Sequence, residues 1–132
     1  MNLKILFKKS ECSFKGEKHM IGRNKNGKFK KMNFCGPGTN LDKRSKGKCS
    51  KPISKVDAQC KTHDYAYQKI SNGKFKKLPK KMKKKLVRKA DKDMINAMKN
   101  NKSIEAKILK KIMESKIRLE KLGLLSQLKF IS

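Results

Sequence analysis

Residues 57–67 read DAQCKTHDYAY and place His63 and Asp64 side by side in a segment with helical spacing. Residues that favour burial recur here every three or four positions, which is typical of one face of a helix. Ser54, followed by an acidic residue three positions later, predicts the N-terminal cap of this helix, and residues 71–73 (SNG) predict its end at a C-cap glycine. The expected inner face comprises Val56, Cys60, His63, Tyr67 and Ile70.

Two further helices are expected after this one. Pro79 favours the first turn of the second helix, residues 100–103 interrupt it, and Ser103 is expected to cap a third helix that ends at Gly123. The apolar stripe of the second helix is expected to comprise Met82, Leu86, Ala90, Met94 and Met98. That of the third is expected to comprise Ile104, Ile108, Ile112, Leu119 and Leu122. The sequence therefore predicts an all-α fold of three helices with short connections.

The chain is strongly basic and has a small apolar fraction. Its 132 residues include 38 Lys and Arg against 10 Asp and Glu, with a net charge of +28 and 36% hydrophobic residues. A chain of this length forms one domain with a modest core. The charge predicts attraction to polyanions, either an anionic membrane or nucleic acid, and does not choose between them. No apolar run approaches the roughly 18 residues of a membrane span, and no export signal is expected.

Residues 1–52 show no sustained period, so a short apolar element followed by irregular structure is expected there. The four cysteines (Cys12, Cys35, Cys49 and Cys60) allow two disulfides in any of three connectivities. Cys35 lies in the glycine-rich turn FCGPGTN, residues 34–40, and Cys60 lies one turn before Asp64, so a bridge between these two would join the turn to the helix. Cys12 and His19 are interpreted as exposed loop residues.

The neighbours His63 and Asp64 point about 100° apart on a helix and therefore face different surroundings. His63 is expected to face the second helix, where Asp91 would hold one ring nitrogen and leave the other to act as a base. Tyr67, one turn further on, would hydrogen-bond the same carboxylate. Asp64 is expected to face the glycine-rich turn. Backbone carbonyls of that turn, together with the carboxylate, are the oxygen ligands that calcium prefers. Each of these features also has an interpretation without function. His63 would be a hydrogen-bonded core residue, the glycine-rich segment would be a plain turn, and Asp57 and Asp91 would only relieve lysine repulsion.

Together these residues resemble the phospholipase A2 pattern: a glycine-rich calcium loop, then D-x-x-C-x-x-H-D-x-x-Y, then an aspartate on a second helix. The resemblance covers residues 33–98. The form GPGTNLD, residues 36–42, is similar to the phospholipase domain of parvoviral minor capsid proteins, whereas the Cys35 and Cys60 pair matches a disulfide of the secreted enzymes. The resemblance implies two antiparallel catalytic helices, an N-terminal calcium loop and a third, C-terminal helix.

Two points depart from the family pattern. The gap from His63 to Asp91 is longer than usual, so Asp93 is a rival for the same position. Cys12 and Cys49 have no counterpart, and either pair with each other or stay reduced.

The resemblance implies calcium-dependent hydrolysis of the sn-2 ester of glycerophospholipids. His63 would take a proton from the attacking water, and Asp91 with Tyr67 would orient His63. Calcium and a loop amide near Gly36 would stabilise the oxyanion. The implied calcium ligands are the carbonyls of Phe34, Gly36 and Gly38 and the carboxylate of Asp64.

The expected organisation is a basic N-terminal segment (1–32), a catalytic core (33–100) and a C-terminal amphipathic helix with a tail (101–132). The expected partner is an anionic phospholipid membrane, with nucleic acid or capsid proteins as further partners of lysine-rich runs such as residues 76–85. The resemblance implies a virion or an infected cell, with membrane breaching during entry as the role, and secretion is the alternative. The alternative function is an inactive basic homologue that binds membranes or nucleic acid, although retention of His63 and Asp64 favours an enzyme.

Overall fold

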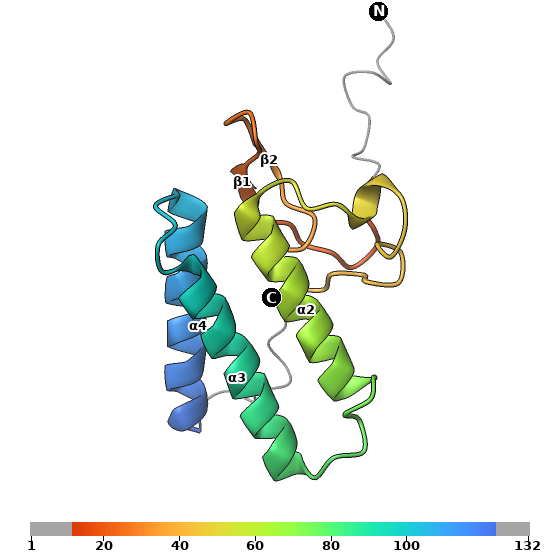
Figure 1. Cartoon of the computed structure of the whole chain (residues 1–132), viewed down its shortest axis with the longest axis vertical. Helices are drawn as coiled ribbons and strands as arrows, with labels where there is room; N and C mark the ends of the chain where they lie inside the picture. Colours follow the sequence, from red (N-terminus) through yellow and green to blue (C-terminus); the bar gives the residue numbers. More distant parts are fainter. Residues whose placement is uncertain (1–11, 124–132) are drawn as a thin grey trace, which may run out of the picture.

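The computed structural model describes residues 12–123, which form three helices beside a loop region and a short hairpin (Figure 1). Consecutive helices run antiparallel, with α3 in contact with both α2 and α4 (Figure 1). The expected all-α fold is therefore confirmed. The elements are β1 (Ile21–Arg23), β2 (Phe29–Lys31), a 3-10 turn η1 (Lys48–Ser50), α2 (Lys55–Ser71), α3 (Lys80–Met98) and α4 (Ile104–Lys121).

Helix α2 begins as the sequence predicts and ends at the predicted place by a different route. The side chain of Ser54 accepts a hydrogen bond from the backbone nitrogen of Asp57, at 3.1 Å. The C-cap residue is Asn72, and Gly73 does not adopt a positive φ, so the predicted C-cap glycine is wrong. A Cβ atom at Gly73 would instead crowd the backbone of Lys69, so position 73 requires a residue without a Cβ atom, which is glycine.

Helix α3 buries only part of the predicted stripe. Met82 is 49% exposed, whereas Val87 and Asp91 are fully buried together with Met94 and Met98. The predicted stripe took every fourth residue, and four residues turn a helix by about 40° more than a full circle. A strict four-residue stripe therefore drifts away from the contact face, while spacings of four and three follow it.

The predicted stripe of α4 is wrong by about one residue. Ile104 is 60% exposed, and Ile108, Leu119 and Leu122 are exposed as well. The buried residues of α4 are Glu105, Ala106, Leu109, Met113 and Lys116. From position 106 onward they are spaced by three, four and three residues, which matches the helical repeat better than the isoleucine series.

The hairpin of β1 and β2 is an element that the sequence did not predict. Its strands pair antiparallel with Ile21 opposite Lys31 and Arg23 opposite Phe29. Strands of three residues are too short for an alternating pattern to be visible. The hairpin packs against the start of α4, where the backbone nitrogen of Arg23 donates to a carboxylate oxygen of Glu105 at 3.3 Å.

The main core joins the loop region to all three helices. It is cross-linked by a disulfide between Cys35 and Cys60, and a second disulfide joins Cys12 to Cys49. Of the three possible connectivities, the one that links turn to helix is present. Within residues 12–123, no helix combines the length and the apolar character needed to cross a membrane. The core residues are Met32, Phe34, Cys35, Val56, Cys60, Met94, Met98, Ala106, Leu109 and Met113.

Candidate active site

Helices α2 and α3 bring a histidine and an aspartate together in the interior. His63 Nε2 lies 2.7 Å from Asp91 Oδ1, and the two side chains are 1% and 0% exposed. The hydroxyl of Tyr67 donates to the same oxygen of Asp91 at 2.5 Å. The structure thus places these three residues in the contacts that the sequence predicts. Asp93, the rival, is 61% exposed and pairs with Lys89 at the surface.

Lys116 of α4 completes the surroundings of Asp91, a contact that the sequence did not predict. Its Nζ donates to Asp91 Oδ2 at 2.6 Å and to Glu120 Oε1 at 2.5 Å. It also lies 5.4 Å from the centre of the Tyr67 ring, and its side chain is 1% exposed. Lys116 and Glu120 stand four residues apart, the spacing of a helical ion pair, which was the one available signal. Neither residue was included in the stripe predicted for α4.

The charge state of the cluster follows from these contacts. Burial alone would raise the pKa of Asp91, but hydrogen bonds from His63, Lys116 and Tyr67 outweigh it and lower the pKa overall. Burial raises the pKa of Tyr67, and the neighbouring Asp91 carboxylate raises it further. Asp91 is therefore an anion and Tyr67 a neutral hydrogen-bond donor.

The glycine-rich turn directs alternate carbonyls to opposite sides. The carbonyls of Cys35 and Pro37 accept hydrogen bonds from the N-terminal segment, from the backbone nitrogens of Met20 and Lys18, both at 3.0 Å. The carbonyls of Phe34 and Gly36 face the other way, and both accept from the hydroxyl of Thr39, at 3.2 Å each. Two of the three predicted carbonyl ligands therefore converge on one point.

Glycine is required at two positions of this turn. Gly36 and Gly38 have φ values of +131° and +79°, and a Cβ at either position would collide with the backbone of Lys18 or Gly16. The positive φ values and the close passage of residues 16–18 allow the chain to present its carbonyls in this way. Gly38 precedes Thr39, which lines the adjacent pocket.

Asp57 fixes the start of the turn to the start of α2. Its carboxylate accepts hydrogen bonds from the backbone nitrogens of Asn33, Phe34 and Ile53 at 2.9, 2.7 and 3.0 Å. Asp57 is fully buried. The interpretation of Asp57 as a charge that only relieves lysine repulsion is therefore wrong.

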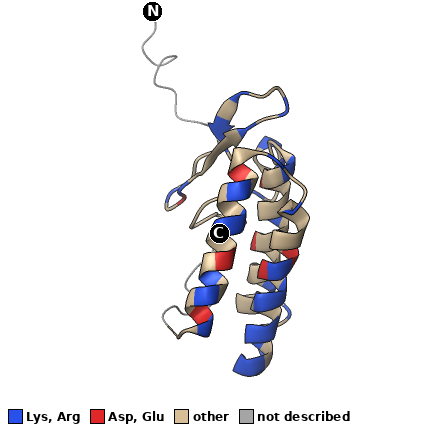
Figure 2. Ribbon diagram, turned by 90° about the vertical axis from the view of Figure 1, so that its left-hand side faces the viewer, with Lys and Arg blue, Asp and Glu red and all other residues tan. Residues whose placement is uncertain are grey.

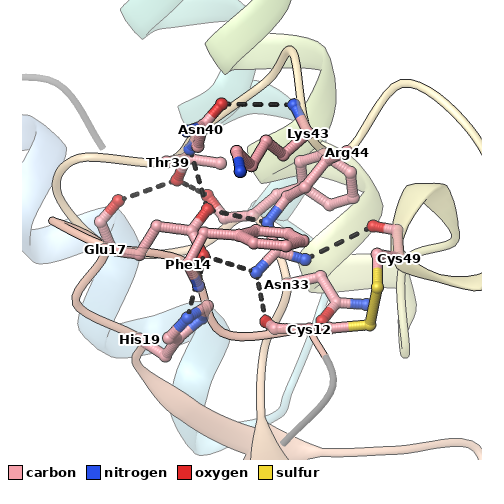
Figure 3. A network of polar contacts seen from close by, with 12 residues as sticks. Cys12, Phe14, Glu17, His19, Asn33, Thr39, Asn40, Lys43, Arg44 and Cys49 are labelled. Carbon is pink, nitrogen blue, oxygen red and sulfur yellow. Dashed lines mark hydrogen bonds and ion pairs between the residues drawn. A yellow bond between two sulfur atoms is a disulfide. The ribbon is translucent and has the colours of Figure 1, made fainter.

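A buried ion pair fixes the other end of the turn (Figure 3). Glu17 accepts from Arg44 through both oxygens, at 2.7 and 2.8 Å, and from the backbone nitrogen of Asn40 at 2.7 Å. Arg44 also donates to the carbonyls of Cys12 and Cys49, the two residues of the second disulfide. Burial would raise the pKa of Glu17, but the hydrogen bonds from Arg44, Asn40 and Phe14 lower it overall.

Two residues interpreted as exposed loop positions belong to this buried network. His19 Nδ1 lies 2.6 Å from the carbonyl oxygen of Met32, and its Nε2 lies 3.3 Å from Glu17. Cys12 is bonded to Cys49. Both interpretations are corrected, because the folded N-terminal segment covers the turn with contacts that a local sequence pattern does not reveal.

Asp64 lies on the side of α2 next to residues 39–42. It lines a pocket of about 230 Å³ between α2 and residues 39–42, where Thr39 forms part of the opposite wall. Asp64 is buried. The structure therefore brings Asp64 to the same pocket as Thr39, whose hydroxyl contacts the carbonyls of Phe34 and Gly36.

The chemistry of the predicted ligand set, one carboxylate with backbone carbonyls, suits a hard cation. Among residues 12–123, no group of three or more His, Cys, Asp or Glu side chains could hold a metal ion. The predicted set needs only one such side chain, Asp64, since its other donors are backbone carbonyls. Oxygen atoms of this kind suit calcium and do not suit zinc, which prefers nitrogen and sulfur.

The comparisons with known proteins agree with this geometry. A model of the family described as "Phospholipase A2-like domain" matches residues 25–116, more than two thirds of the chain. The protein therefore belongs to the phospholipase A2-like domain family. The matched region contains the turn, the His63 and Asp91 pair and, as its last residue, Lys116. No curated protein and no solved structure matches the chain.

Proposed function

We propose that the protein is a calcium-dependent phospholipase A2 that hydrolyses the sn-2 ester of glycerophospholipids. The observation that carries the proposal is the buried contact of 2.7 Å between His63 and Asp91, with Asp64 on the adjacent side of the same helix. A histidine held by a carboxylate is a general base with a fixed tautomer. A neighbouring carboxylate that faces carbonyl oxygens is suited to a divalent cation.

The chain's own residues account for the proton transfer. Asp91 accepts from His63 Nε2, so Nδ1 is the nitrogen that takes a proton from the attacking water. The Asp91 carboxylate then stabilises the imidazolium, while Tyr67 holds the carboxylate in place. The attack by water needs no serine nucleophile. Calcium, held by Asp64 and by the carbonyls of Phe34 and Gly36, would supply a Lewis acid for the ester carbonyl.

Positional hydrolysis tests this function. Phosphatidylglycerol vesicles with different acyl chains at sn-1 and sn-2 are incubated with the parent chain and with His63→Gln. We expect the parent to release the sn-2 acid selectively, and His63→Gln to be slower by about 10²–10⁴-fold. Equal vesicle binding by the two proteins is the control. Equal release from both positions, or an unchanged rate in His63→Gln, would contradict the proposal.

We also propose an anionic membrane as the working surface. Lysine and arginine recur along the helices (Figure 2), and the start of α3 is almost entirely basic. Each basic residue near an anionic leaflet contributes up to about 1 kcal/mol of binding free energy, which salt reduces. We expect faster hydrolysis on anionic than on neutral vesicles at low salt, and a smaller difference at high salt. A higher rate on neutral vesicles would count against this partner.

The setting inside a virion or an infected cell stays a prediction that rests on the likeness of residues 36–42 to the parvoviral form. The same net charge of +28 supports nucleic acid as a second partner. Fluorescence anisotropy with a labelled duplex, at increasing salt, measures that binding. A chain that binds the duplex with no salt dependence would argue against a phosphate contact surface.

A further inference from the structure

We propose that Lys116 of α4 is a positioning residue for the His63 and Asp91 pair, an inference that rests on the proposed function. Oδ1 of Asp91 serves both His63 and Tyr67, and Oδ2 serves Lys116. Each oxygen of the carboxylate therefore has its own donors. They come from two different helices, α2 and α4.

The contact with Lys116 fixes the orientation of the Asp91 carboxylate. A carboxylate held through one oxygen can still turn about its bond to Cβ, which would move that oxygen relative to His63. Lys116 holds the second oxygen at 2.6 Å, and its own position is fixed by Glu120 at 2.5 Å. Since all three side chains are at most 1% exposed, water cannot replace these bonds.

Glu120 offsets part of the charge of Lys116, which limits the competition between Lys116 and the histidine for Asp91. An isolated ammonium beside Asp91 would weaken the attraction between that carboxylate and an imidazolium at His63. Glu120 accepts from the same ammonium, which makes Lys116 and Glu120 together a neutral pair. Arg88 lies 3.9 Å from the other oxygen of Glu120. Asp91 therefore keeps more of its attraction for an imidazolium at His63 than it would beside an isolated ammonium.

The alternative is a buried ion pair that serves only the fold. Such a pair can usually be replaced as a unit by neutral residues without loss of structure, whereas removal of one partner leaves a buried charge. The two roles therefore differ in what the double replacement does. If Lys116 only stabilises the fold, removal of both charges restores the activity, and if it positions Asp91, activity stays low.

The experiment measures kcat and KM for sn-2 hydrolysis on anionic vesicles. We expect Lys116→Met to lower kcat by about 10–100-fold with KM changed by less than about twofold. Lys116→Arg keeps the charge and the donors, and we expect it to recover most of the lost kcat. Lys111→Met, at an exposed position of α4, is the matched control and should behave as the parent.

The double variant Lys116→Met with Glu120→Gln decides between the two roles, and thermal unfolding checks that each variant is folded. We expect its kcat to stay within about threefold of that of Lys116→Met. A double variant with the parent's kcat, an unchanged kcat in Lys116→Met, or loss of the fold in both variants would overturn the inference. A parent chain that releases no fatty acid would overturn the proposed function instead, and the inference with it.

Discussion

Asp91 is the residue on which the contacts of the site converge. It accepts hydrogen bonds from His63, Tyr67 and Lys116, and it is completely buried. A buried carboxylate without such donors would favour its protonated form. With them, its pKa is lowered, and it remains an anion beside the histidine at neutral pH.

Replacement of this aspartate should abolish most of the activity. Asp91→Asn keeps the shape of the side chain and removes the charge that stabilises the imidazolium, so we expect kcat to fall by about 10²–10⁴-fold. Asp93→Asn is the matched control, because Asp93 lies on the same helix and is exposed. Fatty-acid release from anionic vesicles measures both. Equal loss of activity in both variants would contradict the role of Asp91 as the partner of His63.

At this scale, the sequence predicted the residues whose roles follow from helical spacing. His63 and Tyr67 are four residues apart, so they share a face, and a carboxylate opposite them could be sought on the next helix. The sequence did not predict that the side chains of Lys116 and Asp57 are buried, because that burial depends on partners 25 and 23 residues away. In a composition rich in lysine, Lys116, the one buried lysine among residues 12–123, does not stand out.

Helix α4 is the element in which the packed face differs most from the sequence expectation. Its buried face carries Leu109 and Met113 together with Lys116, while the isoleucines at 104 and 108 are exposed. The contacts of α4 with α3 and β1 select this face. The choice therefore depends on tertiary contacts that apolar spacing alone does not contain.

A pair of substitutions on α4 tests the observed face. Met113 is fully buried, so Met113→Ala should lower the free energy of unfolding by about 2–4 kcal/mol. Ile108 is 45% exposed, so Ile108→Ala should cost less than about 1 kcal/mol. Urea unfolding of both variants gives the comparison. A larger loss for Ile108→Ala would support the predicted isoleucine stripe instead.

The helices were predictable as elements and the hairpin was not. Ser54 and Ser103 cap α2 and α4 as expected, and their side chains accept from backbone nitrogens three residues later. Caps are local, so a single sequence shows them. The hairpin of β1 and β2 has three-residue strands and packs on α4 through Arg23 and Glu105, which are 82 residues apart. No short stretch of sequence indicates that contact.

For the whole molecule, two buried acidic residues should make the free energy of unfolding depend on pH. One lies in the loop region and the other lies between the helices. Glu17 joins Arg44 to the turn, and Asp91 joins α2, α3 and α4. Both have a lowered pKa in the folded chain, after burial is outweighed by their hydrogen bonds. Each therefore adds stability that is complete above its unfolded pKa of about 4 and is lost as pH falls through the lower folded value.

Stability should accordingly fall between pH 5 and pH 3, at about the unfolded pKa of these acids. Because one of the two groups is missing in Glu17→Gln, we expect a lower free energy of unfolding at pH 5 and a smaller further decrease toward pH 3. Urea unfolding at the two pH values, on the parent and the variant, measures this. An identical decrease in both proteins would show that Glu17 is not one of the groups responsible.

The calcium dependence of sn-2 hydrolysis, in the parent chain and in Asp64→Asn, is the most direct test of the proposed function and of Asp64 as a calcium ligand. Asp64 lines the pocket beside residues 39–42, whereas the contact of 2.7 Å with Asp91 is made by His63. We predict that the parent's rate saturates with calcium and falls to background in chelator, while Asp64→Asn needs at least about tenfold more calcium or shows no rate. A parent rate that is equal in calcium and in chelator, or an Asp64→Asn variant that follows the parent's calcium curve, would contradict it.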